Sequence, residues 1–323
     1  MRLAWWLVLV IALVAVVLIA LSVGTVRLSP AIAWRALMGD GDVTAVSVVR
    51  TLRLPRTLLA VLVGAGLGLS GAALQGALRN TLAEPYLLGV SGGAAVGAVL
   101  ATLAGLPPGA LPLAAFAGAI LAVVVTFFVA HVSGARGDSR TLLMAGVVVG
   151  AFANAAIMLA LANATPDTIR NAVWWMMGSV ADASWSSVLV LLIYTALAGG
   201  FLVLLGRDID ALALGEDAAA GLGLNVDRSL RRIFLVASLV AAATVASAGL
   251  IGFVGLIVPH MARALGLTRA RSQLLACALL GGILVVLADL AGRVAMPATE
   301  IPLGAITALV GVPFFLIKLR RLR

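Results

Sequence analysis

Long apolar segments separated by short polar stretches dominate this sequence. Segments of about 20 residues are long enough to cross a hydrocarbon core of about 30 Å, so we interpret them as membrane-spanning helices. About ten spans are predicted in this way, at residues 4–23, 57–78, 87–105, 111–131, 141–162, 185–205, 232–249, 252–265, 272–291 and 302–317. The eighth is the weakest, because it is short, rich in glycine and interrupted by Pro259. The runs are continuous rather than alternating, which excludes a transmembrane β-barrel.

Composition agrees with an all-α polytopic membrane protein. Of the 323 residues, 63% are hydrophobic and 11% are charged, whereas soluble domains carry about 25% charged residues. The first apolar segment is longer than the apolar region of about 7–15 residues in a secretory signal, so we expect it to stay as a span. No soluble domain is recognisable, and we expect residues 1–323 to form one transmembrane domain.

The basic residues predict an orientation. If both termini are cytoplasmic, 15 of the 22 basic residues fall on the inner side, as the positive-inside rule requires. Their place in short loops explains the net charge of +9 without nucleic acid. Five of the other seven lie in the longest outer loop, residues 24–56, where Ser29-Pro30 predicts a capped short helix over 31–38.

Several kinds of chemistry are missing from the sequence. The only lysine, Lys318, is followed by leucine, so the Gly-Lys-Ser/Thr loop that binds nucleotide phosphates does not occur and any ATP must be bound by another chain. The lone Cys277 and the separate His131 and His260 form no metal-ligand cluster. We therefore assign no catalytic residue, no metal and no cofactor to this chain.

The second span carries small residues at intervals of four, namely Gly64, Gly68, Ala72 and Gly76. Small residues at this spacing allow two helix backbones to approach closely, so we expect tight packing there. Gln75 adds one polar group, which we expect to pair with a neighbouring helix. Pro259 removes a helix hydrogen bond in the eighth span and predicts either a hinge beside a pathway or a packing kink.

The longest inner loop, residues 207–231, is named the coupling loop below. Its sequence favours short helices, with Gly215 breaking them and Gly223 ending the second. Leu214, Ala218 and Leu222 share one face by helical spacing. Such an exposed amphipathic element is either a docking surface for a partner or a loop that rests on lipid.

Five motifs occur in a characteristic order. They are Arg50-Thr-Leu-Arg53-Leu-Pro55-Arg56, Arg79-Asn80-Thr81-Leu82-Ala83-Glu84-Pro85-Tyr86 with the following Leu87-Leu-Gly89-Val-Ser-Gly-Gly93, Leu214-Gly215-Glu216-x-x-Ala219, the glycine-rich run from Gly249 to Arg263, and Glu300-Ile-Pro302-Leu-Gly304. Together they resemble the FecCD-type permeases, the permease subunits of type II ABC importers for iron siderophores, haem and cobalamin. Thr81 stands where proline is common in that family.

The resemblance implies the type II importer permease fold with ten spans per protomer and a homodimer in the cell inner membrane. Two copies of a cytoplasmic ABC ATPase, which hold ATP and Mg²⁺, would dock inside, and a periplasmic substrate-binding protein would dock outside. The implied ATPase-coupling residues are Leu214, Gly215, Glu216, Ala219 and Gly223. The implied cytoplasmic gate consists of Asn80, Thr81 and Leu82 together with Ser139, Arg140 and Thr141. Arg53, Arg56 and Arg293 would receive glutamates of the binding protein, and Pro259 would be a hinge.

The expected function is therefore uptake of an iron chelate, a siderophore or haem, driven by ATP hydrolysis in the partner subunit. A cobalamin permease of the same family is the nearest alternative. An ion-coupled secondary carrier is a different one, but it needs buried ionisable groups as relays, and the spans hold very few. The sequence shows no group of residues that resembles the catalytic site of a membrane enzyme. An exporter would not explain the arginines of the outer loop.

Overall fold

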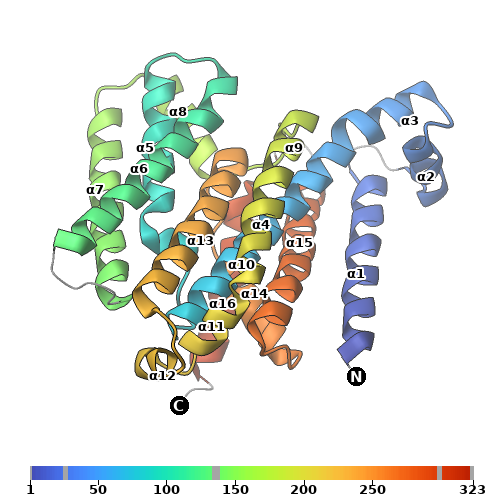
Figure 1. The fold of residues 1–323 in the computed structure, drawn as a ribbon. Helices are drawn as coiled ribbons and strands as arrows, with labels where there is room; N and C mark the ends of the chain where they lie inside the picture. The colour runs from blue at the N-terminus through green and yellow to red at the C-terminus, as the bar shows by residue number, and fades with distance from the viewer. Residues whose placement is uncertain (1, 25–27, 133–138, 297–299, 321–323) are drawn as a thin grey trace.

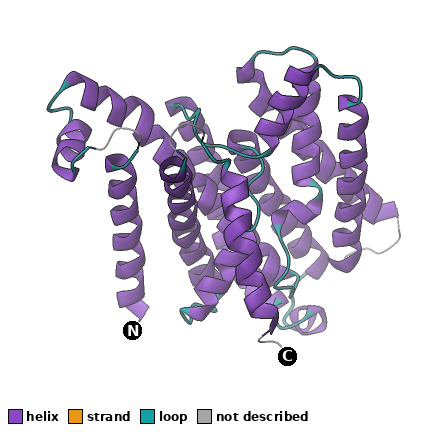
Figure 2. Cartoon of the chain, turned by 180° about the vertical axis from the view of Figure 1, so that it is seen from behind, coloured by secondary structure: helices purple, strands orange, loops and turns teal. Residues whose placement is uncertain are grey.

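The computed structural model describes residues 2–24, 28–132, 139–296 and 300–320. Within these ranges the regular structure is helical (Figure 2). The α-helices are α1 (Arg2–Ser22), α2 (Pro30–Met38), α3 (Val43–Ser47), α4 (Leu54–Ala77), α5 (Val90–Leu103), α6 (Leu111–Val132), α7 (Ser139–Leu161), α8 (Pro166–Met176), α9 (Trp185–Tyr194), α10 (Gly200–Leu204), α11 (Gly206–Leu212), α12 (Glu216–Gly221), α13 (Val226–Ala248), α14 (Val254–Ala264), α15 (Ala270–Ala295) and α16 (Leu303–Arg320). Two π-helical turns, η1 (Val48–Arg53) and η4 (Thr195–Gly199), and two 3₁₀ turns, η2 (Pro85–Leu88) and η3 (Pro108–Ala110), connect some of them.

Each predicted span coincides with a helical segment, so the all-α membrane fold is confirmed. Among the described residues, 7 helical segments are long and apolar enough to cross a membrane, and Val90–Leu103 and Leu303–Ile317 are shorter apolar helices. The eighth predicted span is wrong as a full crossing. α14 has 11 residues, which extend over only about 16 Å, because a glycine-containing link precedes it and Gly266, at φ 75°, follows its end.

The two ends of the molecule carry different elements. The chain termini lie at the lower end in Figure 1, where α11 and α12 also lie. The upper end carries α2, α3 and α8 (Figure 1). The coupling loop and the predicted outer loop therefore lie at opposite ends of the helical bundle, as the sequence predicts.

α4 is the central helix and packs against α13, α14 and α15. A Cβ atom added to Gly64 would lie 2.0 Å from the carbonyl oxygen of Gly281 on α15, and one added to Gly71 would lie 2.0 Å from that of Gly255 on α14. The backbones therefore touch through their glycines, which confirms the close packing expected from the small residues of this helix.

The predicted outer loop is shorter than expected, because the helix that contains α4 begins earlier. Helical residues run without interruption from Val43 to Ala77. Pro55 does not stop this helix, since the preceding π-turn shifts the hydrogen bonds and the Leu54 amide donates to the carbonyl of Val49. The predicted short helix is confirmed as α2, whose cap is Ser29 Oγ accepting from the Ile32 amide at 3.3 Å.

Candidate functional site

The coupling loop has the local structure that its glycines predict. Gly215, at φ 117°, separates α11 from α12, and Gly223, at φ 84°, follows the end of α12. Leu214 and Glu216 are exposed at the lower end, whereas Ala219 is fully buried. Ala219 therefore packs α12 against the rest of the protein. It lies outside the exposed face that a partner could contact.

Two carboxylates fix the coupling loop to the spans. The Asp208 carboxylate accepts a hydrogen bond of 2.7 Å from the Ser229 hydroxyl near the start of α13. Asp210 accepts one of 2.8 Å from the Ala270 amide at the start of α15. Short polar contacts therefore hold α11, which contains both carboxylates, to the lower ends of the two long helices α13 and α15.

The chain between α4 and α5, residues 79–89, is named the gate loop below. Its first residue, Arg79, has a positive φ of 51°, and its guanidinium lies against Gly215 of the coupling loop, 3.1 Å from where a Cβ would stand. Asn80 Oδ1 accepts from the Leu82 amide at 2.9 Å and closes a turn. Thr81 and Leu82 are exposed at this turn.

The other half of the predicted gate is the beginning of α7. This helix starts at Ser139 and packs against η2 of the gate loop. The side chains of Ser139 and Arg140 lie outside the described part of the chain, and that of Thr141 is half-buried. The gate formed by these residues stays a prediction.

The second half of the gate loop turns into the protein and meets the link between α13 and α14, residues 249–253. Glu84 Oε1 accepts a hydrogen bond of 2.8 Å from the Phe253 amide. The Tyr86 hydroxyl accepts one of 3.0 Å from the Ile251 amide. These two side chains thus satisfy backbone donors that no helix satisfies. The sequence suggests only that Glu84 lies beside Arg79, so this contact was missed.

Burial raises the pKa of the Glu84 carboxyl above its ordinary value, while the hydrogen bond from the Phe253 amide opposes this shift. Desolvation disfavours the charged carboxylate, and the amide dipole favours it. The desolvation is the larger cause, so the negative charge is held here at a cost in stability.

Gln75 supports the proline-containing helix α14. Pro259 has no amide to donate to the carbonyl of Gly255, and Gln75 Nε2 donates to that carbonyl at 3.2 Å and to that of Leu256 at 3.3 Å. Gln75 Oε1 accepts from the Arg263 guanidinium at 2.8 Å. The expected pairing of Gln75 with a neighbouring helix is confirmed, whereas a hinge at Pro259 stays a prediction.

The three arginines assigned to binding-protein docking all have partners within the chain. Arg53 is buried and donates to the carbonyls of Leu21 and Ser22, at 2.8 and 3.0 Å, where α1 ends. Its long side chain therefore caps the C-terminus of α1. A docking contact with Arg53 would require these bonds to break.

The other two arginines meet at Asp289. Arg293 is buried and pairs with Asp289 at 3.0 Å, the i, i+4 pair expected from the sequence. Arg56 pairs with Asp289 at 2.7 Å and with Glu300 at 2.7 Å. Asp289 thus connects α4 and α15, and the docking role of Arg56 and Arg293 stays a prediction.

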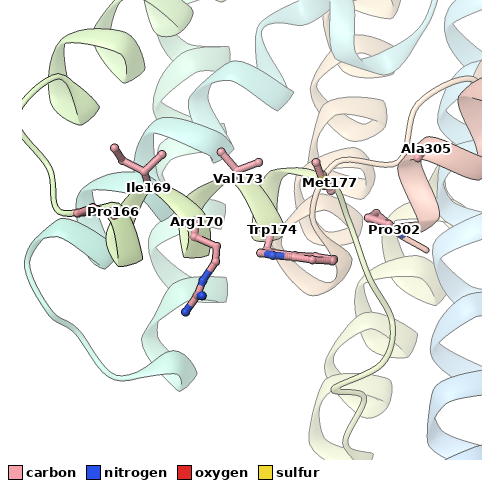
Figure 3. A pocket seen from close by; sticks show the side chains of 8 residues that line it. All are labelled: Pro166, Ile169, Arg170, Val173, Trp174, Met177, Pro302 and Ala305. Atoms are coloured by element: carbon pink, nitrogen blue, oxygen red, sulfur yellow. The ribbon is translucent and has the colours of Figure 1, made fainter. Parts of the chain in front are cut away.

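A cavity of about 680 Å³ opens at the upper end between α8 and the start of α16 (Figure 3). Its walls are almost entirely apolar, and the Trp174 ring and the Arg170 side chain both extend from α8 beside it (Figure 3). Arg170 also pairs with Asp167 at 3.1 Å on the exposed face of α8. We name this cavity the upper pocket; it is lined by Pro166, Ile169, Arg170, Val173, Trp174, Met177, Pro302 and Ala305.

The predicted spans do not indicate the upper pocket, because residues 163–184 lie between two of them and were expected only to connect them. The available signal was Thr165-Pro166 followed by an amphipathic run, which is the start of a capped helix. In the structure Thr165 Oγ1 accepts from the Thr168 amide at 3.4 Å and begins α8.

Known proteins match this chain over nearly its whole length. The FecCD transport family matches residues 12–321. The cobalamin import system permease protein BtuC of Halobacterium salinarum is 43% identical over 281 residues, which cover 86% of this chain and 74% of that protein. The Fe(3+)-citrate import system permease protein YfmE of Bacillus subtilis is 34% identical over 316 residues, covering 97% and 94%.

A solved structure has the same fold. It is an inward-facing structure assigned to the metal-chelate type of ABC transporter, with a TM-score of 0.86, 31% sequence identity and coverage of 97% of both chains.

Proposed function

Because this chain belongs to the FecCD transport family and is the permease, not the ATPase, of an ABC importer, we propose that it carries an iron chelate across the inner membrane. The observation that carries this proposal is the match over residues 12–321. The energy comes from ATP hydrolysis in a partner subunit, since the single lysine of the chain builds no phosphate-binding loop.

The two ends of the bundle suit two different partners. Leu214 and Leu222 are exposed apolar side chains on the coupling loop, and Glu216 lies between them in sequence. We assign the ATPase to this lower end, which makes the termini cytoplasmic. The binding protein then docks at the upper end, where the Arg56–Glu300 pair reaches the surface.

A homodimer is the assembly that this arrangement supports. The upper pocket is open and lies between α8 and the start of α16 (Figure 3). Large apolar side chains such as Phe152 of α7 and Leu309 of α16 are exposed as well. A second copy would cover these faces and close a pathway between the two protomers, with the gate loops at its inner end.

An iron chelate is the first cargo candidate because the upper pocket combines an apolar wall with the guanidinium of Arg170. Ferric chelates and haem present organic surface together with anionic oxygen groups, and this pair of features is complementary to them. Cobalamin is the second candidate, since one relative described as a cobalamin permease is 43% identical to this chain.

The test is reconstitution with the ABC ATPase and the substrate-binding protein of the same organism that form a complex with this chain. Ferric siderophores, ferric citrate, haem and cobalamin are added singly, and ATPase stimulation and uptake into proteoliposomes are measured. We expect one chelate to stimulate hydrolysis and to accumulate only when ATP and the binding protein are present. Uptake driven by an ion gradient without ATP would contradict the proposal.

A further inference from the structure

We infer that Glu84 and Tyr86 are positioning residues that join the gate loop mechanically to the upper pocket through the link 249–253. The inference rests on the proposed function in one respect, because it names residues through which that transporter would transmit movement. The contacts of Glu84 and Tyr86 with the link do not depend on which cargo is carried.

The lower part of the connection is the gate loop. Arg79 lies against Gly215 between α11 and α12, as described above. Five residues later, Glu84 accepts the hydrogen bond of the Phe253 amide at 2.8 Å, and Tyr86 accepts that of Ile251 at 3.0 Å. One short segment thus touches both the coupling loop and the link, and two side chains hold its inner end.

The upper part of the connection is the other side of the same link. The Ser179 amide donates to the carbonyl of Ala248 at 2.8 Å. A Cβ added to Gly178 would lie 2.6 Å from the carbonyl oxygen of Leu250, and one added to Gly249 would lie 2.3 Å from that of Trp175. The end of α8, which forms a wall of the upper pocket, is therefore packed directly onto the link.

The start of α16 completes the arrangement. The amides of Leu303 and Gly304 donate to the carbonyls of Gly178 and Met177, each at 3.0 Å. Further along α16, a Cβ added to Gly311 would lie 2.4 Å from the ring of Phe253. Movement of the link must therefore displace α8 or α16, because no space separates these backbones.

Glu84 and Tyr86 are the points at which this connection depends on side-chain hydrogen bonds. Elsewhere it consists of contacts between backbones and of contacts that the side chains of Arg79 and Phe253 make with Gly215 and Gly311. The chain contains only 2 tyrosines, so Tyr194, whose ring packs against Phe116 at 5.4 Å between centroids, provides a matched control for loss of one phenolic oxygen.

The experiment reports movement at the upper pocket. Ala305→Cys places a thiol in the pocket, while the native Cys277 is fully buried. The permease is assembled with its ATPase and binding protein in nanodiscs, and the rate of maleimide labelling is compared without nucleotide and with ATP and vanadate. A protein without Ala305→Cys measures the background.

We expect the two labelling rates to differ by about fivefold or more when Glu84 and Tyr86 hold the gate loop to the link 249–253. Tyr86→Phe and Glu84→Ala should reduce the ratio toward one, whereas Glu84→Gln, which keeps an oxygen acceptor for the Phe253 amide, should preserve it. Tyr194→Phe should also preserve it. A merely structural role would lower thermal stability without changing this ratio.

Two outcomes would overturn the inference. One is an unchanged ratio in both Tyr86→Phe and Glu84→Ala, and the other is a ratio of one in an unmodified complex that imports its cargo. If no chelate is imported by the unmodified complex, the proposed function fails instead, so the two failures are distinguishable. Tyr86→Phe removes a single oxygen, which keeps the test available if Glu84→Ala does not fold.

Discussion

The Gln75 side chain donates to the carbonyl oxygen of Gly255 at 3.2 Å, at the position where Pro259 leaves a helical carbonyl without its amide. Within a membrane protein, a freed backbone carbonyl must find a donor in the protein or in a water-filled cavity. One glutamine on the central helix thus makes a proline tolerable inside α14.

Replacing this glutamine should destabilise the fold. Gln75→Leu leaves the Gly255 carbonyl without this donor and removes one acceptor of the Arg263 guanidinium, which costs about 1–3 kcal/mol. Thermal unfolding in detergent measures the loss. Gln273 is the other buried glutamine and makes one hydrogen bond of 3.5 Å to Pro259, so Gln273→Leu should cost clearly less. Equal losses in the two variants would contradict this role of Gln75.

The ion pairs around Asp289 should differ in strength according to burial. Asp289→Ala removes the partner of two arginines and leaves Arg293 buried and uncompensated, which costs about 3–5 kcal/mol. Glu300 is 47% exposed as a side chain, so Glu300→Ala should cost about 1 kcal/mol or less. Denaturation midpoints of the two variants test the difference, and a similar small loss in both would show that Asp289 does not hold the cluster together.

The contact between α4 and α15 should not accept a methyl group. Gly64→Ala would place its Cβ 2.0 Å from the Gly281 carbonyl oxygen, and overpacking of this kind costs about 1–3 kcal/mol. Gly150 in α7 is the matched control, because a Cβ there has no neighbour within 4 Å. Gly150→Ala should gain up to about 1 kcal/mol from helix propensity. Stabilisation by both substitutions, measured by thermal unfolding, would be the contradicting result.

Charge reversal on the coupling loop should separate ATP hydrolysis from transport. Glu216 is exposed, and Glu216→Arg reverses the charge on the surface that we assign to the ATPase. We expect intact basal hydrolysis with uptake reduced at least about tenfold, a coupling loss of about 1.4 kcal/mol or more. Normal uptake in Glu216→Arg would remove this residue from the interface.

The buried Glu84 carboxyl should make stability depend on pH. Its pKa is raised by burial, so the folded protein binds this proton more tightly than the unfolded chain does. The stabilisation of the folded state by protonated Glu84 is fully present below the unfolded pKa of about 4.3. It is lost as the pH rises through the raised pKa of the folded state. We therefore expect the free energy of unfolding of Glu84→Gln to change less between acidic and neutral pH than that of the unmodified protein. A profile identical to that of the unmodified protein would indicate that Glu84 titrates normally.

The sequence by itself determined most of the long apolar helices and the breaks within the coupling loop. Apolar length sets the spans, the small residues of α4 set its close packing, and Gly215 and Gly223 set the ends of α12. These are local properties, because helix periodicity and turn chemistry act over a few residues. The order of the motifs also identified the family from the residues alone.

Only the tertiary structure decided which polar groups meet. The contact between Glu84 and Phe253 joins positions 169 residues apart, and that between Gln75 and Gly255 joins positions 180 apart. Only the structure shows that Arg53, which was expected at a docking surface, also caps α1 through the carbonyl of Leu21, 32 residues earlier. A sequence pattern carries no information on such pairings, since they depend on which helices pack side by side and on which backbone groups that packing leaves without a partner.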